Sequence, residues 1–443
     1  MHDAWIALAR VVLGAGATLN PLEGTVMNAR HWVGFATSLL ALNGCTTPQS
    51  PVASTPGPDA APFFEIREDA AYLDSRLRAV QTPLSLRAPE GAGNATHPRT
   101  AADPVALTLV GELLPPQVSG LVVQACDLDI ATIGRTVVVG GNVAGPDAAG
   151  AMQVVDFTNA DRPRLVAEVV FPHADVHSVC KRGIFIYCGV SSDDPTWNAP
   201  VRLVEFRQVS TGVVSTGRWL ELPSHAVTDL AGDGDWLLAS VGADAGGVVL
   251  INRVQLQTAG FVPALDARAC AFDPQGGVVS LAGGAGGLAS WTLPGLAPVG
   301  AVTVEGLQYE SAKGTIEAQG AYRYVAAGDG GFQVFDRDGT LHAVLPNAFH
   351  MGHVASDRVT NAVSVIGKLA FVAAGALGVR VVDLGPWSPS TPDPSSTGLT
   401  LLGEIDFTDE VSSNMVKARG DMLVVAGGLG GVKLVRMSSA GGV

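Results

Sequence analysis

The chain has 443 residues, of which 27 are basic and 41 acidic, so its formal net charge is −14 and its charged fraction is 15%. This acidic balance leaves no basic field for a phosphate backbone, which argues against nucleic-acid binding. The hydrophobic fraction of 47% argues against disorder over most of the length, and 54 glycines without a collagen period favour short strands and tight turns over long helices.

Residues 27–45, MNARHWVGFATSLLALNGC, are predicted to be a secretory signal. Arg30 supplies its positive charge, and residues 32–42 form an apolar stretch that is too short to span a bilayer. The ending Leu-Asn-Gly-Cys45 resembles the bacterial lipoprotein signal, and this resemblance implies that Cys45 is the lipid attachment site. The chain would then be held at the cell envelope, on the outer membrane or the cell surface. A plain secretory signal with an unused thiol is the alternative.

Residues 46–103 follow the predicted anchor and differ in composition from the rest of the chain. They begin with the Pro/Ser/Thr-rich run TTPQSPVASTPGPDAAP, which lacks the apolar residues needed to fold. We therefore predict a flexible tether here. Within it, residues 65–80 can form one short amphipathic helix with Tyr72, Leu73 and Leu77 on one side.

Residues 104–438 repeat one pattern seven times, namely a strand, a glycine turn and a second strand. The clearest copies are GAYRYVAAGDGGFQVFD at 320–336, GKLAFVAAGALGVRVVDL at 367–384 and GDMLVVAGGLGGVKLVRM at 420–437. Two further strands precede each hairpin, so each unit supplies four strands. The turn glycines are Gly134, Gly183, Gly234, Gly276, Gly320, Gly367 and Gly420. Their spacing of 42 to 53 residues is typical of the blades of a β-propeller.

Three of these copies resemble the LVIVD-repeat β-propeller family, because YVAAGDGGFQVFD, FVAAGALGVRVVDL and MQVVDF close on Asp336, Asp383 and Asp156. The resemblance covers residues 104–438 and implies an all-β, seven-bladed β-propeller. Runs such as VVVGG and LVVAGG are apolar throughout, as strands buried on both faces of a sheet are. Because each unit begins with its outermost strand and the last ends on its third, we expect strand 107–113 to close the last blade.

Motifs for a nucleophile elbow, a zinc-binding helix or a phosphate loop are missing from the sequence. We therefore predict no catalytic residue and no cofactor, and we interpret the glycine-rich stretches 283–287 and 427–431 as turns between strands. The cysteines downstream of Cys45 form no C-x-x-C pair, and we expect them to pack as small buried residues. A two-residue turn at 182–183 would place Cys180 opposite Phe185 and not opposite Cys188. One disulfide in an exported protein is the alternative. These four cysteines are Cys126, Cys180, Cys188 and Cys270.

Histidines gather in the connectors between an outer strand and the next inner strand, which surround one mouth of the central channel. With nearby carboxylates, they could hold a divalent metal or serve acid–base chemistry. The simpler interpretation is that they are solvated or hydrogen-bonded loop residues, since the sixth unit lies far around the ring from the second and third. The candidates are His173, His177, His225, His350 and His353, with Asp175, Asp229 and Asp357 in the same connectors.

These observations predict a monomeric, lipid-anchored propeller that acts as a non-enzymatic scaffold. Its partner would be an unknown envelope protein or surface ligand bound through the loop face, and its only membrane contact would be the anchor. The competing hypothesis is an exported metal-binding protein or enzyme that uses the connector histidines and aspartates. A structural envelope component without a discrete ligand is a third alternative.

Overall fold

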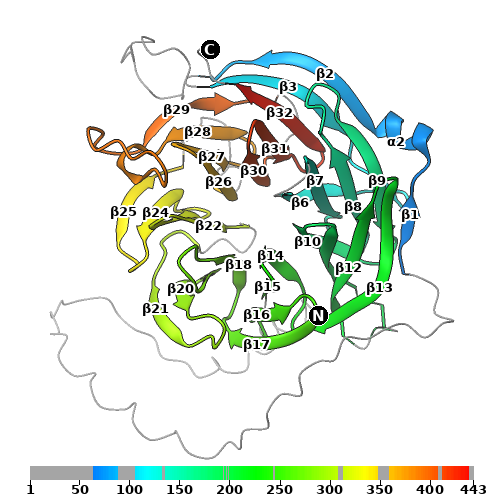
Figure 1. The fold of residues 1–443 in the computed structure, drawn as a ribbon, viewed down its shortest axis with the longest axis horizontal. Helices are drawn as coiled ribbons and strands as arrows, with labels where there is room; N and C mark the ends of the chain where they lie inside the picture. The colour runs from blue at the N-terminus through cyan, green and yellow to red at the C-terminus, as the bar shows by residue number, and fades with distance from the viewer. Residues whose placement is uncertain are drawn as a thin grey trace, which may run out of the picture. The chain divides into compact units, whose positions relative to one another are not determined.

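The computed structural model describes residues 63–87, 105–131 and 135–438 with internal gaps, and these residues form seven β-sheet blades in a ring (Figure 1). The predicted all-β, seven-bladed propeller is therefore confirmed. The predicted signal and Cys45 lie outside the described residues. No helix in the described ranges is long and apolar enough to cross a membrane. The internal gaps are residues 193, 196, 198, 243–244, 308–312, 348–358 and 408–411.

Each blade is an antiparallel sheet whose strands follow one another from the centre of the ring to its rim, and we number the blades 1 to 7 in chain order. The inner strands are β6 (Gln124–Ile130), β10 (Asp175–Arg182), β14 (Val227–Asp233), β18 (Ala267–Phe272), β22 (Thr315–Gln319), β26 (Ala362–Ile366) and β30 (Met415–Arg419). The second strands are β7 (Thr136–Asn142), β11 (Phe185–Ser191), β15 (Trp236–Val241), β19 (Val278–Ala282), β23 (Tyr322–Ala326), β27 (Leu369–Ala373) and β31 (Met422–Ala426).

The two outer positions of each blade complete the ring. The third strands are β8 (Gly150–Asp156), β12 (Val201–Val209), β16 (Gly247–Asn252), β20 (Gly287–Trp291), β24 (Phe332–Asp336), β28 (Val379–Asp383) and β32 (Val432–Ser438). The fourth strands are β9 (Arg164–Phe171), β13 (Gly212–Leu222), β17 (Gln257–Pro263), β21 (Pro298–Val302), β25 (Leu341–Leu345), β29 (Thr400–Ile405) and, for blade 7, β3 (Ala106–Leu113). Outside the blades lie the short pair β4 (Gln117–Val118) and β5 (Leu121–Val122), and the 3₁₀ turn η2 (Gly385–Trp387).

The blade that closes the ring joins the two ends of the repeat region. Strand β3 pairs with β32 in antiparallel register from Ala106 opposite Ser438 to Leu113 opposite Val432. Closure by the predicted strand 107–113 is therefore confirmed. This exchange removes the open edge that β32 would otherwise present.

Tight turns join the inner strands to the second strands, and glycine occupies the first turn position in at least four blades. Gly183, Gly320, Gly367 and Gly420 have φ between 58° and 60°, in the left-handed region that glycine enters without a steric penalty. The predicted turn glycine Gly134 lies outside the described residues. The repeated glycines are thus explained by the backbone shape of the hairpin.

Side chains of one blade pack alternately against the blades on either side. Cys188 packs with Met152 and other residues of blades 1 and 2, whereas Cys180 packs with Leu237 and other residues of blades 2 and 3. The predicted turn at 182–183 was wrong by one residue, because Gly183 and Ile184 form the turn and Cys180 lies opposite Tyr187. The two thiols therefore lie on opposite faces of blade 2, and all four described cysteines are free.

We expect the four propeller thiols to be inert in the folded protein. Burial raises the pKa of Cys126 and of Cys180 to about 12, and it also raises the pKa of Cys188 and Cys270. Because the thiolate is the reactive form, a chromogenic disulfide reagent at pH 7.5 should detect these thiols only after denaturation. A Cys45→Ala chain is the appropriate sample, since it removes the fifth cysteine. Rapid reaction of any thiol under native conditions would contradict this packing.

Residues 63–87 form a belt around the rim, where we predicted part of a flexible tether. The belt comprises β1 (Glu65–Arg67), α2 (Ala70–Arg76) and β2 (Leu77–Leu84). Strand β1 adds to the outer edge of blade 1, β2 adds to β3 of blade 7, and Arg87 forms an isolated bridge with Glu404 of blade 6. The helix predicted over 65–80 was too long, because only residues 70–76 are helical. The tether prediction therefore fails for residues 65–84.

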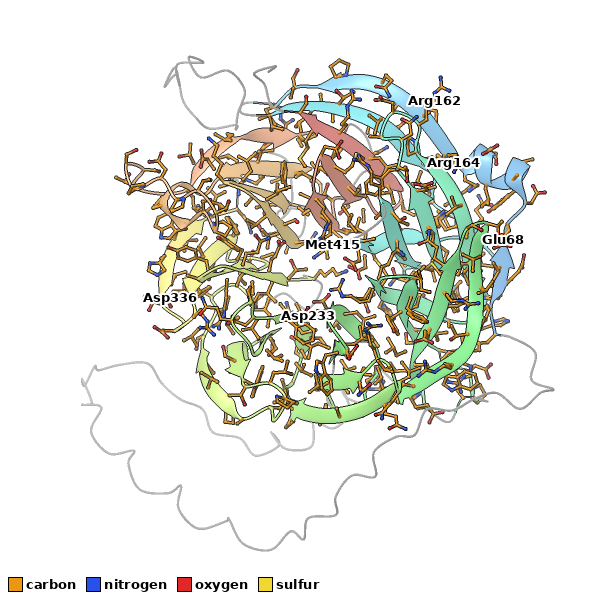
Figure 2. All side chains as sticks on the ribbon, in the orientation of Figure 1. Glu68, Arg162, Arg164, Asp233, Asp336 and Met415 are labelled. Atoms are coloured by element: carbon orange, nitrogen blue, oxygen red, sulfur yellow. The ribbon has the colours of Figure 1, made fainter. Side chains whose placement is uncertain are left out.

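Arginines of the belt lie opposite glutamates of the outer strands. Arg67 pairs in register with Glu168 of β9, and Arg78 pairs with Glu112 of β3. Figure 2 shows Glu68 of the belt at the rim, where its carboxylate accepts a hydrogen bond from the Val213 amide at 3.1 Å. The belt is thus fastened by both backbone pairing and side-chain charge.

Candidate functional site

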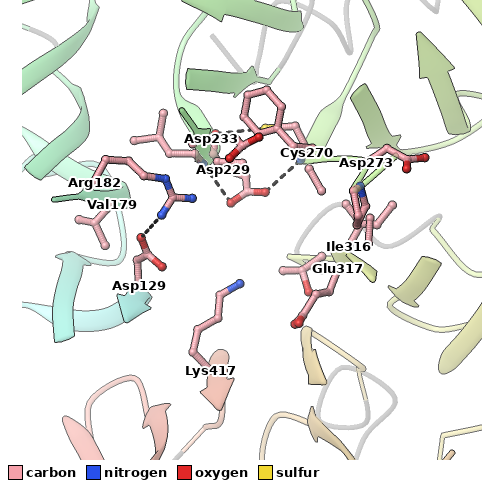
Figure 3. A pocket seen from close by; sticks show the side chains of 18 of the residues that line it. Asp129, Val179, Arg182, Asp229, Asp233, Cys270, Asp273, Ile316, Glu317 and Lys417 are labelled. Carbon is pink, nitrogen blue, oxygen red and sulfur yellow. Dashed lines mark hydrogen bonds and ion pairs between the residues drawn. The ribbon is translucent and has the colours of Figure 1, made fainter. Parts of the chain in front are cut away.

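The inner strands surround a central cavity with a volume of about 570 Å³. Figure 3 shows that charged side chains of both signs reach into this space from several blades. Apolar groups such as Ile316, Phe272 and Met415 complete its wall. Its charged lining residues are Asp127, Asp129, Arg182, Asp229, Asp233, Asp273, Glu317 and Lys417. This cavity, rather than the connectors, is the main candidate site in the described part of the chain.

Carboxylates on the inner strands accept hydrogen bonds from the backbone of the next blade. Asp127 of β6 accepts from the Val179 amide of β10 at 2.8 Å, and Asp129 accepts from the Lys181 amide at 2.8 Å. Donor and acceptor both advance by two residues, so neighbouring inner strands run in the same direction. The same arrangement recurs where Thr315 and Glu317 accept from Val363 and Val365, and where Ser364 accepts from Ala418.

These hydrogen bonds have a structural cause. An inner strand has a sheet neighbour on one side only, so amides along its other edge face the channel without a backbone partner. Side-chain oxygens from the preceding blade satisfy some of them. The acids of the channel are therefore held in fixed orientations by the main chain, which is the condition for a preorganised site.

Lys313, two residues before β22, forms a buried ion pair. Its ammonium group donates to the Cys126 carbonyl at 2.7 Å and lies 3.2 Å from the Asp127 carboxylate. Burial alone would lower the pKa of Lys313, but the charge of Asp127 outweighs it, so the pKa is raised and the lysine stays protonated. One acid and one base of the channel thus neutralise each other.

Asp229 of β14 is a buried acid of the cavity whose pKa is strongly raised. Its carboxylate accepts hydrogen bonds from the Cys270 and Leu230 amides, each at 2.9 Å. Burial, reinforced by the nearby charge of Asp127, nevertheless raises its pKa from 3.8 to about 6. The hydrogen bond from Cys270 and the charges of Lys417 and Lys313 only partly oppose this shift.

We expect the unfolding free energy of Asp229→Asn to rise relative to that of wild type as the pH increases from 4 to 7. The folded chain holds a proton on Asp229 more tightly than the unfolded chain does. The contribution of Asp229 protonation to the free energy of unfolding is therefore complete below about pH 4, and it is lost as the pH rises through 6. Asparagine carries no titratable proton, so the difference in unfolding free energy should shift by about 1–3 kcal/mol in favour of the variant between pH 4 and pH 7. Asn Nδ2 cannot accept the amide hydrogen bond that the second carboxylate oxygen accepts, which adds a cost that does not depend on pH.

Urea unfolding of both chains at several pH values measures this difference. Asp235→Asn removes one charge from a side chain that is 71% exposed and serves as the control. Unfolding free energies of wild type and Asp229→Asn that stay parallel from pH 4 to 7 would contradict the assignment.

The histidines predicted as weak metal candidates are not gathered by the described structure. His173 and His225 are exposed, and His350 and His353 lie outside the described residues, as does Asp357. His177 belongs to β10 rather than to a connector, and its ring contacts Ser191 Oγ at 2.6 Å and Asn142 Nδ2 at 3.4 Å.

The electrostatic setting of His177 also differs from that of a histidine paired with a carboxylate. Burial, together with the charge of Lys313, lowers the pKa of His177 to about 4, so the ring is neutral at pH 7. Within the described ranges, no group of three or more His, Cys, Asp or Glu side chains has a geometry that could hold a metal ion.

The strand bounds decide the placement of two aspartates predicted in connectors and of two glycine-rich stretches predicted as turns. Asp175 and Asp229 are on the inner strands β10 and β14, so their placement in connectors was wrong. The glycine-rich stretches 283–287 and 427–431 join β19 to β20 and β31 to β32, as turns between strands. The turn prediction is therefore confirmed for both stretches.

Sequence reasoning missed the charged residues of the cavity. Glu317 and Lys417 each lie three residues before a turn glycine, Gly320 and Gly420. A charged residue three positions before the turn glycine, in an otherwise apolar inner strand, was the signal in the sequence that could have identified them. Such a residue lies near the channel because no further strand covers the channel-facing edge of an inner strand.

No family model matches the sequence, and no curated protein matches it. Solved structures with a similar fold include "Structure of U3-55K", with a TM-score of 0.51, 13% identity, and coverage of 71% of this chain and 95% of that chain. "Crystal structure of RRP9 WD40 repeats" gives a TM-score of 0.53, 12% identity, and coverage of 80% and 100%. "Crystal Structure of Mitotic Checkpoint Complex" gives a TM-score of 0.52, 15% identity, and coverage of 73% of this chain and 91% of that chain. At these identities the similarity establishes the propeller fold alone.

Proposed function

We propose that this protein is a non-enzymatic interaction scaffold, anchored to the cell envelope through lipid on Cys45. The observation that carries the scaffold function is an uneven rim. The belt adds a strand to blades 7 and 1 and contacts the outer strands of blades 6 and 2, whereas the outer strands of blades 3, 4 and 5 carry no additional strand in the described chain.

Large apolar side chains are exposed on these three consecutive blades. On the outer strands β17, β21 and β25, Phe261 is 42% exposed, Val299 67% and Leu341 48%, and Val344 is exposed as well. Exposed apolar groups that gather on one part of a surface are typical of protein interaction sites. The proposal therefore places the partner on the rim of blades 3–5, and not on the loop face that the sequence favoured.

The anchor is supported by sequence features alone. The segment 27–45 resembles a lipoprotein signal, and only residues 46–62 separate Cys45 from the first described residue. A connection this short would keep the propeller near the membrane surface. The resemblance to LVIVD-repeat propellers is compatible with a protein that presents a rigid ring outside the cell.

One experiment tests the anchor and the partner surface together. Cells expressing the full chain are fed an alkyne fatty acid, and a photoreactive amino acid replaces either Phe261 or Val299. A third chain carries the same amino acid at Leu114, which is 46% exposed and lies outside the rim of blades 3–5. We expect fatty-acid labelling that disappears in Cys45→Ala, and one crosslinked partner from positions 261 and 299 only.

The two parts of the proposal fail separately. Labelling that persists in Cys45→Ala, or that never occurs, would overturn the anchor. A crosslink yield from position 114 equal to that from positions 261 and 299, or no crosslink from positions 261 and 299, would overturn the proposed partner surface.

A further inference from the structure

Charge pairing in the central cavity is incomplete. Asp127 is paired with Lys313, Asp129 lies 3.7 Å from Arg182, and Asp273 is paired with Arg323 and Arg337. Four charged residues of the wall are left over. Asp233, at the end of β14, is exposed, and we call the other three the unpaired triad: Asp229, Glu317 and Lys417. No member of the triad has an ion-pair partner within 4 Å among the described residues.

Lys417 is the cation of this triad, on the inner strand of blade 7. Figure 3 shows its ammonium group directed into the cavity, toward the space between Asp229 and Glu317. Burial lowers its pKa, but Glu317 and three aspartates outweigh that effect, so the pKa is raised and the charge is kept. An ammonium group can donate three hydrogen bonds, and this one donates none to the described residues.

The two acids of the triad are fixed in place by the main chain. Asp229 accepts from the Cys270 and Leu230 amides, each at 2.9 Å. Glu317 accepts from the Val365 amide at 3.1 Å and from the side-chain amide of Gln319. A carboxylate oxygen accepts more than one hydrogen bond, so each acid still has acceptor capacity toward the cavity. The site therefore presents one donor cation and two oriented acceptors across a shared space.

The arrangement of charge selects among ligands. A simple anion would meet Lys417 but also the two carboxylates, and a simple cation would meet the carboxylates but also Lys417. A molecule with an ammonium group at one end and a carboxylate at the other satisfies both. Binding pockets for small molecules typically measure about 300–1,000 Å³, and the cavity lies within that range.

We propose that the central cavity binds a small zwitterion, with its carboxylate on Lys417 and its ammonium group between Asp229 and Glu317. This site is independent of the anchor and of the partner surface on the rim. Apolar side chains such as Ile316 and Met415 would contact the carbon chain between the two charged ends.

Calorimetric titration of the full chain with matched probes tests the proposal. The zwitterions are glycine, 4-aminobutyrate and 6-aminohexanoate, which differ in the separation of their charges. Butyrate and n-butylamine each carry only one of the two groups of 4-aminobutyrate. We expect at least one zwitterion to bind at one site per chain, and both single-charge probes to bind about 10- to 100-fold more weakly than the best zwitterion.

Variants locate the site. Lys417→Met should weaken binding of the best zwitterion about 10- to 100-fold, whereas Lys368→Met should not change it, because Lys368 is 54% exposed and outside the cavity. If Lys417→Met does not fold, the comparison of zwitterions with single-charge probes on the wild-type chain still tests whether the cavity binds a zwitterion. Absence of binding by all three zwitterions at 10 mM, equal binding of butyrate or n-butylamine, or equal loss in Lys368→Met would overturn the proposal.

Discussion

Removal of β3, residues Ala106–Leu113, is expected to abolish the cooperative unfolding transition of the propeller. This strand pairs with β32 on one side and β2 on the other, so its loss opens blade 7 and releases part of the belt. Its side chains Leu107, Val110 and Leu113 are at most 3% exposed. Burial of each contributes roughly 1.5–3 kcal/mol, and the sum is comparable with the ~5–15 kcal/mol total stability of a domain.

Thermal unfolding followed by circular dichroism measures the effect of this deletion. A chain shortened by residues 390–395, all exposed in the loop between β28 and β29, is the control and should melt as wild type does. A point variant covers the case in which the deletion yields no soluble protein. Leu113→Ala should lower the unfolding free energy by about 2–5 kcal/mol, and Leu114→Ala, at a 46% exposed site, by less than about 0.5 kcal/mol. Equal effects of the two alanines would contradict closure by β3.

The ring could be predicted because its cause is repeated along the sequence. Gly183, Gly320, Gly367 and Gly420 mark the same left-handed turn, and the apolar runs around them reflect burial on both faces of a blade. Seven copies of a weak signal define an architecture that one copy would not. Because the last unit ends on its third strand, the last blade required a fourth strand, and the strand 107–113 at the start of the repeat region supplies it.

The belt could not be predicted by the same reasoning. Its strands occur once, β2 contains Pro83, and neither strand shows the alternation of a half-buried sheet. Pro83 is tolerated because β2 is an edge strand. The available signal was charge complementarity, since three of the four belt arginines lie opposite a glutamate of an outer strand. These pairs are Arg67 with Glu168, Arg78 with Glu112, and Arg87 with Glu404.

The cavity was missed for a different physical reason. The connector histidines were predicted because histidine and carboxylate side chains are common metal ligands. In this fold the inner strand edge needs acceptors for free amides, so Asp127, Asp129 and Glu317 serve the backbone first. Their role becomes visible only when the parallel order of the inner strands is known.

Arg67→Met is expected to destabilise the protein by about 2–4 kcal/mol. The Arg67 guanidinium lies 3.1 Å from the carboxylate of Glu168, a side chain with no exposed surface. Breaking a buried pair from one side leaves a charge in the interior, which usually costs about 3–5 kcal/mol. Hydrogen bonds to Glu168 from Tyr72 at 2.7 Å and Gln153 at 2.9 Å remain and reduce that cost. Urea unfolding of the full chain measures the change.

A second belt arginine provides the matched comparison. Arg78 lies 2.9 Å from Glu112, but its side chain is 74% exposed, and Lys433 also contacts that carboxylate. Arg78→Met should therefore cost no more than about 1 kcal/mol, as exposed ion pairs do. Adding Glu168→Gln to Arg67→Met should restore part of the lost stability, because an amide is cheaper than a carboxylate to bury unpaired. If Arg67→Met and Arg78→Met are equally mild, the belt holds the rim by backbone pairing alone, and the buried charge of Glu168 does not depend on it.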